Sequence, residues 1–254
     1  HLLLTAVEWD HADIYPDKES YLDVFQQLHD NIPSGGIKII SKKTADSELN
    51  TSDCIVYGSS DDCDYKFSSP ESNKDGIGFK ITCQGETYEI FSPIIGEYMA
   101  ENITGCFALA SEIGISPQKI IESIKTFKGI KRRLEKKYEN GLTIFDDIAH
   151  SPAKASSALF ALRKIHPDSK IIAIFEPNTG NRKNEAIDGY YNAFKNADEV
   201  IIPRLTKIKT DKNEQSRPLE GRDLVEIISR SHQNAVYIDN DAELIDYITK
   251  KTQP

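Results

Sequence analysis

Two arginines, two aspartates and a histidine lie within one short stretch of the chain, residues 129 to 152. Arg132 and Arg133 precede an Asn-Gly turn and an apolar run, and Asp146, Asp147 and His150 follow that run. Guanidinium groups bind phosphate oxygens, while carboxylates and imidazoles bind metal ions or transfer protons. This spacing predicts a site for a phosphorylated ligand and its metal. The alternative is that the aspartates only cap a strand and solvate a loop.

Two other polar groups also follow apolar runs that read as strands. Glu8-Trp9-Asp10-His11 contains an Asp-His pair, which is a plausible part of a Mg²⁺ site. The alternative for His11 is a capping or packing role. Phe175-Glu176-Pro177-Asn178-Thr179-Gly180-Asn181-Arg182 leaves a strand and precedes a helix. Its alternative is an ordinary loop rich in Pro and Gly.

Strand–loop–helix units are expected to position these groups. Residues 142 to 145 read as the strand before Asp146, and Ser151-Pro152 begins a helix over residues 152 to 165. Strands near 170–175, 199–202 and 236–238 then alternate with helices near 185–196, 219–229 and 242–249, which is typical of a parallel sheet. Ligands bind such sheets beyond the carboxyl ends of the strands. We therefore predict an α/β fold.

The first part of the chain also reads as α/β. Strands are expected at residues 2–7, 37–40 and 54–57, with a hairpin over 78–82 and 87–91. The Ser- and Asp-rich segment 59–75 predicts an irregular surface crossing. Helices are expected at 102–113 and after Ser116-Pro117. A change of pattern near 93–98 predicts a boundary between a domain of residues 1–95 and one of residues 96–254.

Bulk composition excludes several functional classes. The 254 residues carry a formal net charge of -9, which argues against a non-specific nucleic-acid binder. No apolar run approaches the roughly 20 residues needed to span a bilayer, so we expect no membrane partner. The four cysteines show no zinc-type spacing and predict reduced thiols in a cytoplasmic protein. No Gly-x-x-x-x-Gly-Lys phosphate loop is present, and the chain enters directly on an apolar strand, as an internal fragment would.

Several motifs together resemble the Mur ligases, the ATP-dependent amide-forming enzymes of cell-wall peptidoglycan synthesis. Arg132-Arg133-Leu134-Glu135 is similar to the family's Arg-Arg-[Phe/Leu]-Glu, and residues 146–152 to its Asp-Asp-x-Ala-His-His-Pro. Residues 96–110 resemble the family's Gly-x-His-Asn-x-x-Asn-x-x-Ala-Ala segment. Residues 4–15, with Glu8-Trp9-Asp10-His11, most resemble the murein tripeptide ligase branch. The likeness covers nearly the whole chain in order.

The resemblance implies the latter part of a P-loop-type central ATPase domain, followed by a Rossmann-like C-terminal domain. The family's N-terminal UDP-sugar domain and phosphate loop are missing, so we expect the chain by itself to be inactive. Residue by residue, the resemblance implies Mg²⁺ binding by His11 and ATP contacts by Asn102, Arg132 and Arg182. It implies catalytic roles at the phosphate or the amine for Arg133, Asp147 and His150.

For the parent enzyme the resemblance implies ATP and Mg²⁺ as cofactors, and UDP-N-acetylmuramate and an amino acid or peptide as substrates. The branch joins L-alanyl-γ-D-glutamyl-meso-diaminopimelate to the muramate carboxylate through an acyl phosphate during cell-wall recycling. Two alternatives remain open. One is a UDP-N-acetylmuramate–L-alanine ligase, and the other is a non-catalytic nucleotide-binding module. The sequence does not indicate an oligomeric state.

Overall fold

The computed structural model describes residues 1–7, 14–15, 17–207 and 217–252. The chain forms two compact units, residues 1–128 and 129–254. The sequence predicts a boundary near residues 93–98. The first unit extends further because two helices, α3 (Tyr98–Glu112) and α4 (Pro117–Thr126), pack against its sheet. Their apolar faces complete a core that the strands alone leave open.

The first unit is built on a six-stranded sheet with the strands in chain order. Its strands are β1 (Leu2–Leu4), β2 (Lys38–Ser41), β3 (Ile55–Gly58), β4 (Tyr65–Asn73), β5 (Gly76–Cys83) and β6 (Glu86–Ser92). The first four pair in parallel and the last three pair antiparallel. The predicted hairpin is confirmed, with Gln84 and Gly85 at its turn in the left-handed conformation.

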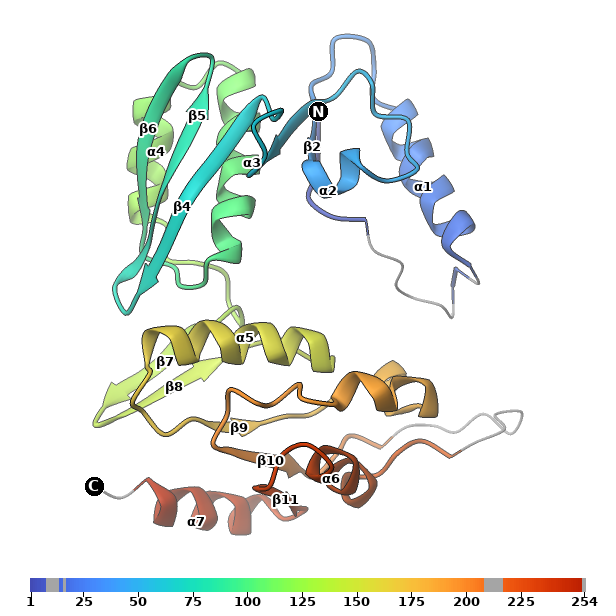
Figure 1. Cartoon of the computed structure of the whole chain (residues 1–254), viewed down its shortest axis with the longest axis vertical. Coiled ribbons are helices and arrows are strands. Elements are labelled where there is room, and N and C mark those ends of the chain that lie inside the picture. Colours follow the sequence, from blue (N-terminus) through green and yellow to red (C-terminus); the bar gives the residue numbers. More distant parts are fainter. Residues whose placement is uncertain (8–13, 16, 208–216, 253–254) are drawn as a thin grey trace. The chain divides into compact units, whose positions relative to one another are not determined.

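The two faces of this sheet carry separate cores. Ile39 and Ile40 are neighbours in β2 and both are fully buried, yet they belong to different apolar clusters, because successive strand side chains point to opposite faces. On one face Ile39 lies in a cluster with residues of α3 and α4. These two helices pack against the sheet (Figure 1). On the other face, Ile40 packs with Phe25 of α1 (Lys18–Asp30) and Ala45 of α2 (Lys42–Ala45).

The second unit contains two small sheets. Strands β9 (Ile172–Ile174), β10 (Glu199–Pro203) and β11 (Ala235–Ile238) form a parallel sheet with β10 in the middle. Strands β7 (Glu135–Asn140) and β8 (Leu142–Asp146) form an antiparallel hairpin whose turn contains Gly141 at a positive φ. The strand predicted at residues 142–145 is confirmed. Its partner, however, is β7, and it does not join the parallel sheet.

Helices cover the parallel sheet, as the alternating pattern predicts. They are α5 (Pro152–Ile165), α6 (Gly221–Ser229) and α7 (Asp241–Lys251), with two 3₁₀ helices, η1 (Thr179–Arg182) and η2 (Asn184–Tyr190) (Figure 1). Ser151 caps α5 by accepting the N–H of Lys154, and Pro152 takes its first position, as expected from Ser151-Pro152. One apolar core joins α5, the segment around η2, β10 and α6.

Gly105 allows α3 to lie directly against β3. A Cβ atom at this position would come within 2.7 Å of the ring of Tyr57, which is fully buried. Gly105→Ala gains about 1 kcal/mol of helix propensity, but overpacking a rigid core costs about 1 to 3 kcal/mol. We expect a net loss of up to about 2 kcal/mol in the free energy of unfolding, measured by urea denaturation.

Gly78→Ala in β5 is the matched control in the same unit. A Cβ at Gly78 meets no atom closer than 4.0 Å, so stability should change little. Equal stability of the two variants would contradict the close helix–strand contact at Gly105.

Candidate functional site

The carboxylate of Asp147 joins two segments of the second unit. Its Oδ2 accepts the backbone N–H of Leu134 and its Oδ1 accepts that of Ala149, both at 2.8 Å. The backbone N–H of Ile148 in turn donates to the carbonyl of Arg132 at 2.8 Å. The stretch before β7 is therefore fastened to the loop after β8. This brings together the two halves of the sequence pattern, the arginine pair and the aspartate pair.

The arginine pair lies in a tightly bent backbone. Arg132 and Leu134 have φ values of +59° and +45°, in the left-handed region that side chains rarely adopt. Glu135 accepts the backbone N–H of Arg132 at 2.9 Å and also pairs with Lys137. Hydrogen bonds from Lys137 and from the Arg132 backbone lower the pKa of the Glu135 carboxyl group. Glu135 therefore stabilises the bent backbone, and its carboxylate is not directed at a ligand.

The bend exposes both guanidinium groups. Arg132 approaches Asp146 at 3.8 Å, with the arginine side chain 59% exposed. Arg133 is exposed too, and no side chain in the described parts of the chain holds its guanidinium. An exposed arginine without an anionic partner is free to take a phosphate group in bidentate fashion.

His150 has a defined hydrogen-bond arrangement. Its Nδ1 lies 2.9 Å from the carbonyl oxygen of Ile148, so Nδ1 is the protonated nitrogen and donates. Its Nε2 lies 3.3 Å from the ammonium group of Lys154 and accepts. Lys154 stands in the first turn of α5, whose free N–H groups also favour an anion. The histidine is therefore a neutral acceptor in a cationic setting.

The loop after β9 meets this arrangement. The backbone N–H of Asn178 donates to the carbonyl of His150 at 3.1 Å. The polar segment 175–182 therefore lies beside the segment 146–150. Asn178 also caps η1 through its side chain, which accepts from Asn181. Because this loop follows the carboxyl end of β9, the candidate site lies at the edge of the sheet where α/β proteins bind ligands.

Arg182 is placed differently from the other arginines. It is only 3% exposed, and its guanidinium donates to the carbonyl oxygens of Leu219 at 2.9 Å and Thr206 at 2.7 Å. A further ion pair with Glu220 measures 3.4 Å. In the structure Arg182 fastens η1 to the segments on either side of residues 208–216. The ATP contact predicted for it stays a prediction, and it requires Arg182 to leave these partners.

The other two predicted residues belong to the first unit. Asn102 is exposed on α3, and the contact of its side-chain amide with the sulfur of Met99 is a weak one at 3.8 Å. It is therefore available to a ligand. His11, predicted to bind Mg²⁺, lies outside the described residues.

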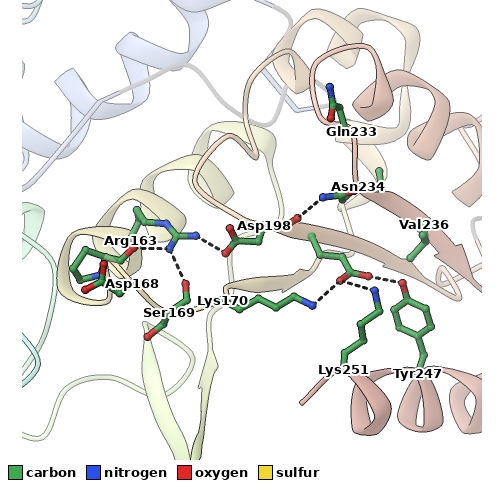
Figure 2. Close-up of a pocket in the computed structure, with 13 residues that line it drawn as sticks. Arg163, Asp168, Ser169, Lys170, Asp198, Gln233, Asn234, Val236, Tyr247 and Lys251 are labelled. Atoms are coloured by element: carbon green, nitrogen blue, oxygen red, sulfur yellow. Dashed lines mark hydrogen bonds and ion pairs between the residues drawn. The ribbon is translucent and has the colours of Figure 1, made fainter. Parts of the chain in front are cut away.

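Sequence reasoning missed a polar hollow of about 630 Å³ at the amino ends of β9, β10 and β11. There Lys170 and Lys251, each at 3.3 Å, and the hydroxyl of Tyr247 converge on the carboxylate of Glu199, which is 4% exposed (Figure 2). The only signal in the sequence was a glutamate opening an apolar strand. Three acidic and three cationic side chains line the hollow, so it offers no net charge to an ion.

The other strong pair in the hollow joins Arg163 to Asp198 at 2.6 Å. Arg163 also donates to the carbonyl oxygen of Ser169 at 2.7 Å (Figure 2). These contacts fasten the end of α5 to the starts of β9 and β10. The hollow is thus a structural network and lies at the opposite end of the strands from the arginine loop.

Comparisons with known proteins agree with this two-unit fold. Residues 2–110 match the Mur ligase middle domain, and residues 132–254 match the Mur ligase, glutamate ligase domain. The two matches follow each other in the same order as the two units. The chain belongs to the Mur ligase family.

Curated relatives include two UDP-N-acetylmuramate–L-alanine ligases. The one from Desulfitobacterium hafniense (strain Y51) is 28% identical over 261 residues, which cover 100% of this chain and 57% of that protein. The one from Ligilactobacillus salivarius (strain UCC118) is 28% identical over 251 residues, covering 97% and 55%. The chain thus spans little more than half the length of these relatives.

Solved structures share the fold. A UDP-N-acetylmuramate-alanine ligase from Thermotoga maritima aligns with a TM-score of 0.71 at 18% identity, covering 93% of this chain and 50% of that one. A murein peptide ligase from Psychrobacter arcticus 273-4 aligns with a TM-score of 0.60 at 19% identity, covering 96% and 51%. A MurF ligase from Thermotoga maritima in complex with ADP gives 0.67 at 12%, covering 99% and 55%.

These alignments support the predicted α/β class of a Mur ligase middle domain followed by a C-terminal domain. Among the residues that the structure describes, no helix has the length and apolar character needed to cross a membrane.

Asp147→Asn tests the tie between the two segments. An asparagine side chain offers one acceptor oxygen, so its amide nitrogen would face either the Leu134 or the Ala149 N–H. An N–H left without a partner costs about 1 to 3 kcal/mol. We expect amide hydrogen exchange over residues 130–150 to quicken markedly, as local opening becomes easier. Asp146→Asn, which removes only a 3.8 Å exposed pair, is the control. Equal protection in both variants would contradict the assigned role.

Glu199 should make stability depend on pH. Burial raises its pKa, but hydrogen bonds from Tyr247, Lys251 and Lys170 outweigh burial and leave it lowered. A lowered folded-state pKa gives stability that is complete above the unfolded value of about 4.3 and is lost as pH falls through the folded value. Glu199→Gln should therefore unfold more easily at pH 7, with the gap to the wild type closing in acid.

The control for Glu199 is Glu226→Gln, a substitution on the exposed face of α6. Its free energy of unfolding should follow the wild type at every pH. A gap between wild type and Glu199→Gln that does not change with pH would contradict the pairing scheme.

Proposed function

We propose that this chain is the middle and C-terminal part of an ATP-dependent ligase that joins an amine to the carboxylate of UDP-N-acetylmuramate. The family assignment and the curated relatives support the reaction class. The observation that carries the proposal is the exposed guanidinium of Arg133, on the bend that the Ile148 N–H and the Asp147 carboxylate tie to the loop before α5, where Lys154 adds a further exposed cation. This is a concentrated cationic surface, suited to a phosphoryl group.

In the proposed reaction the muramate carboxylate attacks the γ-phosphorus of ATP, forming an acyl phosphate and releasing ADP. The amine then attacks the acyl carbon, and inorganic phosphate leaves. Arg133, with Arg132 beside it, holds the negative charge of the phosphoryl group in both steps, which is mainly an electrostatic and positioning task. His150 presents Nε2 as an acceptor for an N–H of the amine once Lys154, which donates to Nε2 in this structure, has turned to the phosphoryl group. Asp147 touches neither substrate in this scheme and acts as a positioning residue through the Leu134 backbone.

Mg²⁺, when bound, would neutralise charge on the transferring phosphoryl group. The aspartate pair of the second unit does not fit the ion, because both oxygens of Asp147 are occupied by backbone N–H groups and Asp146 faces Arg132. The metal is therefore expected on the middle domain, where the sequence predicts that His11 binds it. Asn102, exposed on α3, is proposed to contact the nucleotide from the same domain.

For the acceptor we propose L-alanine, because the curated relatives described above are L-alanine ligases. The second candidate is the tripeptide acceptor. It is supported by the Glu8-Trp9-Asp10-His11 motif and by the fold shared with a murein peptide ligase. The full-length protein should release phosphate from ATP faster with L-alanine than with the tripeptide. The reverse order would move the assignment to the tripeptide branch. No release with either acceptor would favour a non-catalytic nucleotide-binding module.

Arg133→Ala tests the phosphate contact in the full-length protein. Removing one preorganised electrostatic contact commonly raises the barrier by about 3 to 4 kcal/mol, so we expect a fall of about 10² to 10³ in kcat. Lys131→Ala removes a neighbouring exposed cation outside the motif and should leave the rate near normal. A near-normal rate for Arg133→Ala would refute the assignment.

A further inference from the structure

A cluster of metal-ligating side chains lies in the first unit, among residues that the proposed reaction does not use. His29 stands in the last turn of α1, and Asp53 and Cys54 directly precede β3. One ligand atom from each of these three residues lies within 4.8 Å of the other two. Segments 24 residues apart in sequence are thus brought together by a histidine, a carboxylate and a thiol.

Each ring nitrogen of His29 faces a carboxylate oxygen. The histidine is 8% exposed, and its Nδ1 lies 2.9 Å from Oδ1 of Asp30 while its Nε2 lies 2.8 Å from Oδ1 of Asp53. A neutral imidazole carries a single N–H, so it can donate to only one of these carboxylates. The other nitrogen then turns its lone pair toward a carboxylate oxygen. The amide nitrogen of Gln26 also lies 3.4 Å from Nδ1, and a metal ion between Nε2 and Oδ1 of Asp53 would make the second contact favourable.

The surrounding contacts are those of a metal-binding histidine. Such histidines usually donate their second ring N–H to a carboxylate, which is the relation of His29 Nδ1 to Asp30. Ligating carboxylates are themselves hydrogen-bonded, and Oδ2 of Asp53 accepts from Lys38 at 2.7 Å. The thiol of Cys54 lies 3.9 Å from Oδ1 of Asp53, the oxygen that Lys38 leaves free.

Distances and charges both suit a tetrahedral divalent ion. Zinc about 2.1 Å from nitrogen and oxygen and about 2.3 Å from sulfur separates N from O by roughly 3.4 Å and S from O by roughly 3.6 Å. The observed 2.8 Å and 3.9 Å differ from these by about 0.6 Å and about 0.3 Å, so a small movement of the Asp53 side chain would admit the ion. A divalent ion together with Lys38 would balance Asp30, Asp53 and a Cys54 thiolate, leaving the cluster neutral.

We propose that His29 Nε2, Asp53 Oδ1 and Cys54 Sγ form a binding site for a borderline-soft divalent cation of the zinc class, with a fourth position open to solvent. Mixed nitrogen, oxygen and sulfur donors select zinc over Mg²⁺, which prefers oxygen alone. The ion would fasten the end of α1 to the start of β3. The site is independent of the proposed ligase reaction, and its test does not require turnover.

The experiment titrates the metal-free, reduced chain with Zn²⁺ by calorimetry and with Co²⁺ by absorption spectroscopy. The wild type should bind one ion, and Co²⁺ should give a thiolate-to-cobalt charge-transfer band together with tetrahedral visible bands. Burial raises the pKa of the Cys54 thiol to about 11, so binding should also release its proton. Cys54→Ser should weaken Zn²⁺ binding at least about 100-fold and abolish the charge-transfer band. Cys63→Ser removes another half-buried thiol of the same unit and should change neither property.

Asp30→Asn tests the positioning of His29. Loss of such an outer partner typically weakens metal affinity by about 10 to 100-fold. Because Asp30 does not ligate the ion, the charge-transfer band should persist at saturating Co²⁺.

Three results would overturn the proposal. They are absence of binding by the wild type, binding that survives Cys54→Ser, and a cobalt complex without the thiolate band. The wild-type spectrum alone distinguishes a thiolate-bound ion from no site, even if a variant fails to fold.

Discussion

The candidate site depends on a single carboxylate that holds two backbone N–H groups. Asp147 accepts from Leu134 and Ala149 at the same distance, 2.8 Å, and only an ionised carboxylate side chain of this length offers two acceptor oxygens in that geometry. Charge-assisted bonds to backbone N–H groups are among the stronger ones in proteins. They offset the cost of the left-handed backbone at Arg132 and Leu134, which is of order 1 to 3 kcal/mol per residue.

Preorganisation follows from this tie. Arg133 sits between two residues whose backbone is fixed, so its guanidinium is presented from a rigid bend rather than from a mobile loop. The loop that carries Asn178 is held to the carbonyl of His150, and Arg182 fixes the far side of that loop through the carbonyls of Leu219 and Thr206. Charges that are already fixed toward a site need little reorganisation free energy during the reaction, and electrostatic catalysis requires this property.

Local signals in the sequence are sufficient for several elements. Ser151-Pro152 marks a helix start because a hydroxyl cap and a ring without an N–H both suit that position, and α5 begins there. Gln84, Gly85 and Gly141 have a positive φ between two strands, and both hairpins form. The spacing of Arg132, Asp147 and His150 also predicts that these residues share one loop region.

Long-range packing decides what the sequence could not. The Ser- and Asp-rich segment 59–75 contains β4, because Tyr65 is buried against the core and antiparallel pairing with β5 overrides the polar composition. The helix expected near 185–196 is only the 3₁₀ helix η2, whose end is set by Tyr190 buried in the core. The tasks of Asp147 and Arg182 as backbone anchors could not be read from residue type, because their partners lie 13 and 37 residues away.

The neutral hollow around Glu199 has an evolutionary consequence. Its cations and acids satisfy one another at the amino ends of the strands, whereas the arginine bend lies at the carboxyl end and keeps its positive charge exposed. If the proposed function holds, stability and ligand recognition belong to opposite ends of one small sheet. Selection could exchange residues at the recognition end to suit a new substrate while the other end kept the domain folded.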